Sequence, residues 1–222
     1  MVKTATYLAR AILFDWDGTL LDSYQADARA YLAMFRALGI SWSLDDLERH
    51  YSPNWTRVYA AAGVPRSLWK RGDRLWTAAY RNENPALLPG ARRVLESLAG
   101  KFKLGIVSSG NRTRVRRQLR EFRLARHFSV CICNEDVAEK KPHPAPLRAA
   151  LEKLRARPAD CVYVGDTPED IEMARRAGVR AIGVLGPFPS ARRIRAARPD
   201  SLLESIRELP RVLRALDEKS SE

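Results

Sequence analysis

Five short apolar runs alternate with segments of helical spacing, and this alternation constrains the fold more than any other feature of the sequence. The runs lie at residues 11–17, 103–109, 128–133, 161–166 and 180–185. Each run is almost continuously apolar, which is typical of strands in a parallel sheet that helices cover on both faces. The sequence therefore predicts an α/β fold with a Rossmann-like, doubly wound parallel sheet.

A long insertion separates the first two runs, and it exceeds what one crossover helix requires. Residues 22–84 have helical character throughout, and the segment Ala-Leu-Leu-Pro-Gly at 86–90 is a predicted hinge that returns the chain to the sheet. We therefore predict two domains. Residues 1–21 and 85–222 form the α/β core, and residues 22–84 form a small helical domain.

Composition argues against several classes of protein. Apolar residues make up 45% of the chain and charged residues 29%, which is close to the average of globular proteins, so intrinsic disorder is not expected. No apolar run approaches the roughly 20 residues of a membrane-spanning helix, and the first residues lack the pattern of a secretory signal. We expect a cytoplasmic protein that does not interact with membranes.

A net charge of +13 would suit a nucleic-acid-binding protein, because basic patches neutralise phosphates. The basic residues are mostly arginine, however, and they are spread over the whole chain without interleaved aromatic residues that stack on bases. In the densest segment, residues 112–126, Val115, Leu119 and Phe122 share one helical face, and Arg114 and its neighbouring arginines fall outside it. The pattern predicts a solvated helix surface, and we expect no specific nucleic-acid binding.

Carboxylates and a hydroxyl follow the ends of three predicted strands. Ligands bind at the carboxyl ends of strands in open α/β sheets, so these side chains are expected to meet. They are Asp15, Asp17, Ser108, Asp166 and Asp170. Carboxylates held together repel one another, and Mg²⁺ suits hard oxygen ligands while leaving room for water and phosphate. Lys141, which precedes the fourth predicted strand, is the candidate for a positive charge at the same place.

The order of these motifs resembles that of the haloacid dehalogenase superfamily of phosphatases. DWDGTL, the strand end at Ser108, KPHP and GDTPED match the four motifs of that superfamily in the same order, and the resemblance spans nearly the whole chain. The insert after the first motif is similar to the helical cap of the first subclass, which includes phosphoglycolate phosphatases and β-phosphoglucomutases. The resemblance implies Mg²⁺-dependent hydrolysis of a small phosphorylated metabolite.

The resemblance also implies roles for the four aspartates. Asp15 would be the nucleophile that forms an aspartyl-phosphate, and it would also bind the metal. Asp17 would be the general acid and base, and its backbone carbonyl would bind Mg²⁺. Asp166 would bind the metal through its side chain, and Asp170 would do so directly or through water.

Other residues would hold the substrate. Ser108 and the amides of Ser109 and Gly110 would bind the phosphoryl oxygens, and Lys141 would offset the charge of the aspartyl-phosphate. Arg57 lies about where related caps place an anion-binding arginine. The alternative for Arg57 is a solvated helix residue in an arginine-rich chain.

Several alternatives for the function stay open at this stage. The motifs do not separate a phosphatase of the phosphoglycolate or sugar phosphate type from a phosphomutase of the β-phosphoglucomutase type. A different class is a non-catalytic nucleic-acid-binding or adaptor protein, which the charge suggests and the intact motif set disfavours. Asp17 argues against haloacid dehalogenation, because dehalogenases of the superfamily lack an aspartate there. Either a monomer or a homodimer is compatible with the sequence.

Overall fold

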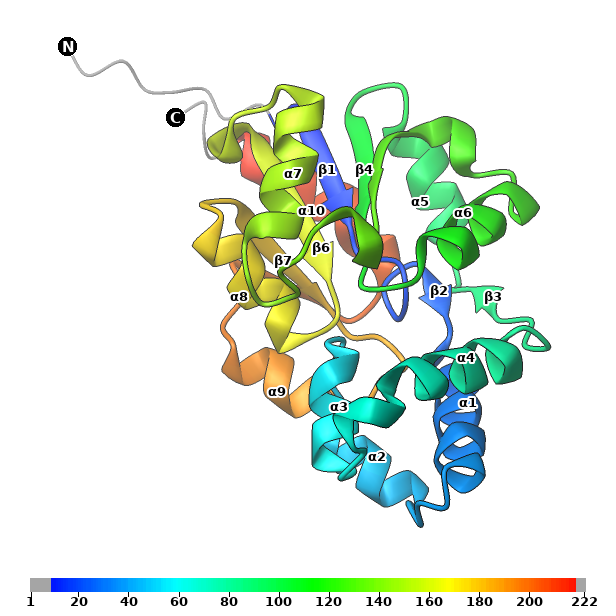
Figure 1. Cartoon of the computed structure of the whole chain (residues 1–222). Coiled ribbons are helices and arrows are strands. Elements are labelled where there is room, and N and C mark those ends of the chain that lie inside the picture. The colour runs from blue at the N-terminus through cyan, green and yellow to red at the C-terminus, as the bar shows by residue number, and fades with distance from the viewer. Residues whose placement is uncertain (1–8, 219–222) are drawn as a thin grey trace. The chain divides into compact units, whose positions relative to one another are not determined.

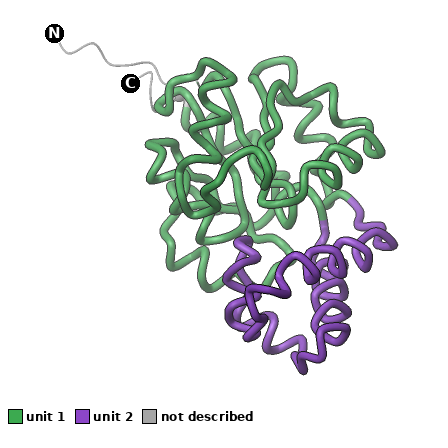
Figure 2. The backbone as a smooth tube through the Cα atoms, in the orientation of Figure 1, with its two compact units in different colours: residues 1–21, 87–222 green, residues 22–86 purple. Residues whose placement is uncertain are grey.

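The computed structural model describes residues 9–218, and Figure 1 shows their helices and strands. The chain forms two compact units (Figure 2). Residues 1–21 and 87–222 make up one unit, and residues 22–86 make up the other, so the second unit ends just beyond the predicted boundary at residue 84. Strands β2 (Leu21–Asp22) and β3 (Ala86–Leu87) pair where the chain crosses between the units.

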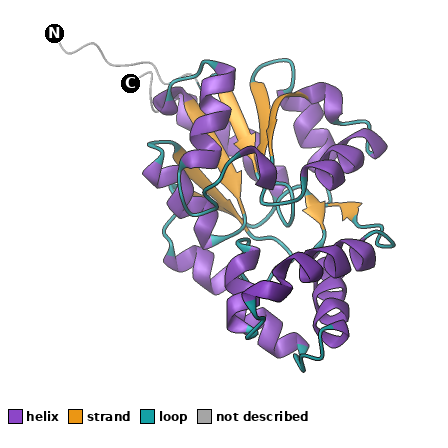
Figure 3. Cartoon of the chain, viewed as in Figure 1, coloured by secondary structure: helices purple, strands orange, loops and turns teal. Residues whose placement is uncertain are grey.

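A six-stranded sheet forms the centre of the larger unit (Figure 3). Its order is β5-β4-β1-β6-β7-β8, and every neighbouring pair is parallel. The strands are β1 (Ala11–Phe14), β4 (Lys103–Val107), β5 (Phe128–Ile132), β6 (Cys161–Gly165), β7 (Arg180–Val184) and β8 (Ser201–Leu203). The predicted α/β fold with a doubly wound parallel sheet is confirmed. Strand β8, which the sequence analysis did not predict, extends one edge.

Alternate residues of the central strand face opposite layers of helices. Ile12 and Phe14 pack in one apolar cluster, whereas Ala11 and Leu13 pack in the other, and all four are fully buried. Helices of the first layer are α5 (Ala91–Leu98), α6 (Arg112–Glu121) and α10 (Leu209–Glu218). Helices of the second layer are α7 (Ala145–Leu154), α8 (Pro168–Arg176) and α9 (Ala191–Ala196). Burial on both faces explains why these strands read as continuous apolar runs.

The smaller unit is helical. Its elements are α1 (Tyr24–Ala37), α2 (Leu44–His50), α3 (Trp55–Ala61), the 3₁₀ turn η1 (Arg66–Leu68) and α4 (Trp69–Tyr80). Aromatic rings pack against one another in this unit: the ring of Trp76 stacks on Tyr80 with centroids 4.8 Å apart, and Trp55 meets Trp69 edge to face at 5.5 Å. Over the described part of the chain, no helix has both the length and the apolar character to cross a bilayer.

Candidate active site

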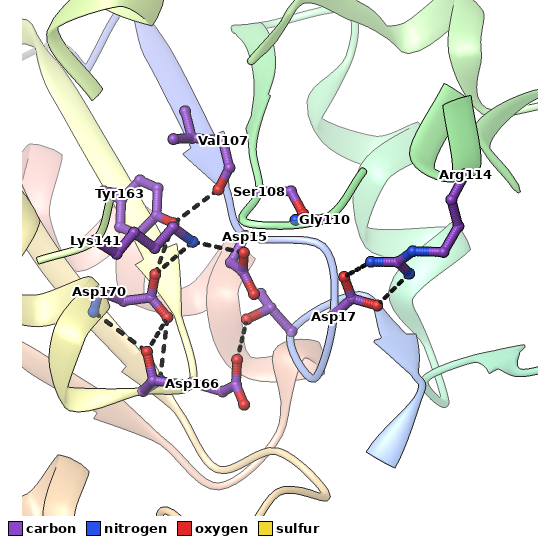
Figure 4. Close-up of polar contacts among 12 residues, drawn as sticks. Asp15, Asp17, Val107, Ser108, Gly110, Arg114, Lys141, Tyr163, Asp166 and Asp170 are labelled. Atoms are coloured by element: carbon purple, nitrogen blue, oxygen red, sulfur yellow. Dashed lines mark hydrogen bonds and ion pairs between the residues drawn. The ribbon is translucent and has the colours of Figure 1, made fainter. Parts of the chain in front are cut away.

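Loops at the carboxyl ends of three adjacent strands build the candidate site (Figure 4). Asp15 follows β1, Ser108 follows β4, and Asp166 follows β6. Because β1 lies between β4 and β6, residues that are far apart in the sequence become neighbours at one edge of the sheet. All three side chains are buried.

A buried lysine connects two of the aspartates. The Nζ atom of Lys141 lies 2.6 Å from Oδ1 of Asp15 and 2.8 Å from Oδ1 of Asp170. It also donates to Oη of Tyr163 at 2.9 Å. Burial lowers the pKa of Lys141, but the charges of Asp15 and Asp170 outweigh that effect and raise the pKa above its usual value. The lysine is therefore held as a cation beside Asp15, whereas Lys140 donates to backbone carbonyl oxygens.

Asp170 has both carboxylate oxygens engaged. It occupies the third position of α8, where its Oδ2 accepts from the backbone amide of Thr167 at 3.1 Å and from the Thr167 hydroxyl at 2.7 Å. Its Oδ1 accepts from the hydroxyl of Tyr163 at 2.9 Å as well as pairing with Lys141. The same carboxylate thus caps a helix and fixes the lysine. Tyr163 was not predicted from the sequence, where its only signal is a hydroxyl within the buried run of β6.

Asp166 presents a buried oxygen that could bind a cation. Its Oδ1 accepts from the hydroxyl of Thr19 at 3.0 Å, but its Oδ2 is buried and has no hydrogen-bond partner among the described residues. Gly18, with φ of +84°, passes so close that a Cβ atom there would overlap this carboxylate. The backbone therefore leaves space for Asp166 only because residue 18 is glycine.

Three carboxylates form a potential metal centre. One oxygen from each of Asp15, Asp166 and Asp170 lies within 4.8 Å of the other two, and all three residues are buried. The pKa of Asp15 is raised to about 7, because burial and the charges of Asp170 and Asp17 together outweigh the lowering by Lys141. Burial and the charges of Asp15 and Asp170 raise the pKa of Asp166 well above its usual range. A divalent cation would offset the repulsion between these carboxylates, and oxygen ligands suit a hard metal ion. The residues present therefore fit a metal site, with Asp15 and Asp166 as the better donors because Asp170 is already engaged.

Ser108 and Gly110 lie where strand β4 leads into α6. The Gly110 amide donates to Oγ of Ser108 at 2.9 Å, and Asn111 caps the helix by accepting from the Arg114 amide. Ser108 is buried, whereas Ser109 and Gly110 are half-buried. A hydroxyl and the amino end of a helix are groups that can bind phosphoryl oxygens. The phosphate-binding role of these residues stays a prediction.

Arg114 contradicts the sequence analysis. Its guanidinium donates two hydrogen bonds to the Asp17 carboxylate, from Nη1 to Oδ1 at 2.8 Å and from Nη2 to Oδ2 at 2.6 Å, and its side chain is only 11% exposed. The prediction that the arginines of this helix lie on a solvated surface is therefore wrong for Arg114. The reason is that Arg114 lies one turn before Gln118, a buried polar residue of α6, and so faces the end of β1.

Arg57 belongs to the helical unit, whereas the residues described above belong to the larger unit. It is part of α3, and its side chain is exposed. An exposed arginine agrees with the anion-binding prediction and with its solvated alternative alike. The role of Arg57 therefore stays a prediction.

Comparison with known proteins identifies the family. The family model described as "Haloacid dehalogenase-like hydrolase" matches residues 12–184, which include each of the loops that build the site. The chain belongs to the haloacid dehalogenase-like hydrolases. This confirms the resemblance that the motifs indicated.

Relatives of this hydrolase include two named phosphatases. It is 30% identical to phosphoglycolate phosphatase from Escherichia coli K12, with 90% of each chain covered. It is 28% identical to pyrophosphatase PpaX from Oceanobacillus iheyensis, with 90% of this chain and 94% of the relative covered. Among solved structures, CbbY from Rhodobacter sphaeroides in complex with phosphate matches with a TM-score of 0.78 and 26% identity, covering 91% of this chain and 96% of that one.

Proposed function

We propose that this hydrolase is a Mg²⁺-dependent phosphatase that releases phosphate from a small phosphorylated metabolite through an aspartyl-phosphate on Asp15. One observation carries the proposal: the buried Asp15 carboxylate lies 2.6 Å from Lys141 and within 4.8 Å of a carboxylate oxygen of Asp166. A nucleophile placed between a fixed ammonium and a potential metal site can approach a phosphoryl group despite their like charges.

The chain's own residues account for two successive displacements. An oxygen of Asp15 attacks phosphorus while the bond to the leaving oxygen breaks, and Asp17 supplies the proton that the leaving oxygen requires. Asp17 then takes a proton from water as that water attacks phosphorus, which frees Asp15 and releases phosphate. Lys141 offsets negative charge beside Asp15 throughout. Bound Mg²⁺, held by Asp15 and Asp166, would supply further positive charge to the phosphoryl oxygens.

The relatives guide the choice of substrates to test. A panel should contain phosphoglycolate, hexose phosphates and inorganic pyrophosphate, each incubated with Mg²⁺ and with excess chelator. We expect Mg²⁺-dependent release of phosphate from at least one member. Conversion of a hexose 1-phosphate into its isomer without net phosphate release would instead favour the phosphomutase. No turnover of any member with Mg²⁺ present would contradict the proposed function.

Arg57 is proposed to bind a second anionic group of the substrate. Arg57→Ala should lower kcat/KM for the best metabolite of the panel by about 10-fold to 100-fold, because a charge-assisted hydrogen bond contributes about 1.5–3 kcal/mol. An aryl phosphate without a second anionic group should be spared. Arg71→Ala, another exposed arginine of the helical unit, is the matched control. Equal losses on both substrates, or none, would assign Arg57 to the solvated surface.

A further inference from the structure

A chain of hydrogen bonds connects the core of the larger unit to Asp17. The indole Nε1 of Trp16 donates to Oε1 of Gln118 at 3.0 Å, and Nη1 of Arg114 donates to the same oxygen at 3.3 Å. The guanidinium of Arg114 then reaches both oxygens of Asp17. Trp16 is fully buried and Gln118 is 3% exposed, so packing fixes the far end of this chain.

The loop after β4 is shaped around the guanidinium. A Cβ atom at Gly110 would overlap a terminal nitrogen of Arg114, so glycine at that position leaves the space that the arginine fills. Figure 4 shows Asp15 facing Lys141, and Asp17 facing Arg114. Each of the two aspartates of the first motif thus has a cation of its own.

We propose that Arg114 is a positioning residue that fixes the carboxylate of Asp17, with Gln118 and Trp16 holding Arg114 in turn. The inference rests on the proposed function, in which Asp17 moves the proton. A fork that contacts both oxygens restricts rotation about both side-chain bonds of the aspartate.

The expected cost of losing this contact follows from geometry. A displacement of about 1 Å in a reacting group can reduce a rate by about 10²-fold, and general acid–base catalysis contributes about 10²–10⁴-fold in all. Arg114→Gln should therefore lower kcat/KM by about 10-fold to 100-fold on an alkyl phosphate, whose leaving oxygen needs a proton. It should change kcat/KM by less than about 3-fold on p-nitrophenyl phosphate, because p-nitrophenolate leaves as a stable anion and needs little protonation. The comparison uses kcat/KM, which covers the steps up to release of the leaving group, because hydrolysis of the aspartyl-phosphate needs Asp17 with either substrate.

The experiment compares Arg114→Gln, Asp17→Asn and the double variant on p-nitrophenyl phosphate and on the alkyl phosphate that the wild type cleaves fastest. Asp17→Asn should lose about 10²–10⁴-fold in kcat/KM on the alkyl phosphate and far less in kcat/KM on the aryl one. If Arg114 acts through Asp17, kcat/KM of the double variant is no lower than that of Asp17→Asn alone. Arg114→Lys keeps the charge without the fork and should give an intermediate loss. Arg120→Gln, an exposed arginine of the same helix, should match the wild type.

Three results would overturn the positioning role: equal losses of kcat/KM on both phosphates, a further loss of kcat/KM from Arg114→Gln in the Asp17→Asn background, or no loss at all. A crystal structure of Arg114→Gln provides a readout that does not depend on activity. We expect the Asp17 carboxylate to leave its wild-type position or to become disordered, and an unmoved carboxylate would refute the inference. Failure of the wild type on the whole panel would instead refute the phosphatase, so the two failures are distinguishable.

Discussion

Asp15→Asn is expected to reduce turnover by at least about 10⁴-fold and to abolish the covalent phosphoenzyme, because loss of a catalytic nucleophile removes the whole covalent route. Asparagine has the size of aspartate, and its carbonyl oxygen can still accept from Lys141, so the fold should persist. Turnover is measured as phosphate release, and the intermediate is measured by mass spectrometry after rapid acid quenching.

Asp45→Asn is the matched control for this variant, because Asp45 is an exposed aspartate of the helical unit. It should keep wild-type turnover and the wild-type phosphoenzyme. Phosphate trapped on any residue other than Asp15, or an active Asp15→Asn variant, would contradict the assignment of the nucleophile.

Mg²⁺ is expected to be essential for turnover and to raise the melting temperature of the wild-type protein. A ligand at 100 times its Kd stabilises the folded state by about 2.7 kcal/mol. Asp166→Asn should lose most of this thermal response and nearly all activity, because it removes the charge of a carboxylate in the centre whose Oδ2 is buried without a hydrogen-bond partner among the described residues. Calorimetry with and without Mg²⁺ measures the response apart from catalysis.

Asp170→Asn makes the comparison sharper. It should retain more of the response to Mg²⁺ than Asp166→Asn, since the Asp170 oxygens are already bound to Lys141, Tyr163 and Thr167. Its metal-free melting temperature should be the lower of the two, because it leaves the buried Lys141 with a single carboxylate partner. Full activity in excess chelator, or equal thermal responses in both variants and the wild type, would contradict the metal site.

The fold could be predicted from the sequence because strands that are buried on both faces consist almost entirely of apolar residues. Strands β1 and β6 are fully buried, and their residues are almost all apolar. Strand β8 is a three-residue segment, Ser201–Leu203, with only one buried residue, so its strand character comes from pairing with β7 and not from its own pattern.

The positions of the site residues that directly follow a strand could be predicted from the sequence. Asp15, Ser108 and Asp166 each follow a predicted strand, so parallel topology alone brings them together. Arg114 and Tyr163 were missed because their roles depend on how one helix and one strand face their neighbours in space. Arginine on an amphipathic helix is usually solvated, and only the structure shows that this one is turned toward Asp17.

The two roles of Asp170 have a consequence for protein engineering. Helix caps are common targets for thermostabilisation, since optimising them usually leaves activity intact. Here the capping carboxylate is also the second counter-ion of the lysine beside Asp15, so a change that improves the start of α8 alters the charge environment of Asp15. Thermostabilised variants of this enzyme should therefore be sought in helices such as α5 or α10, whose ends carry no residue of the site.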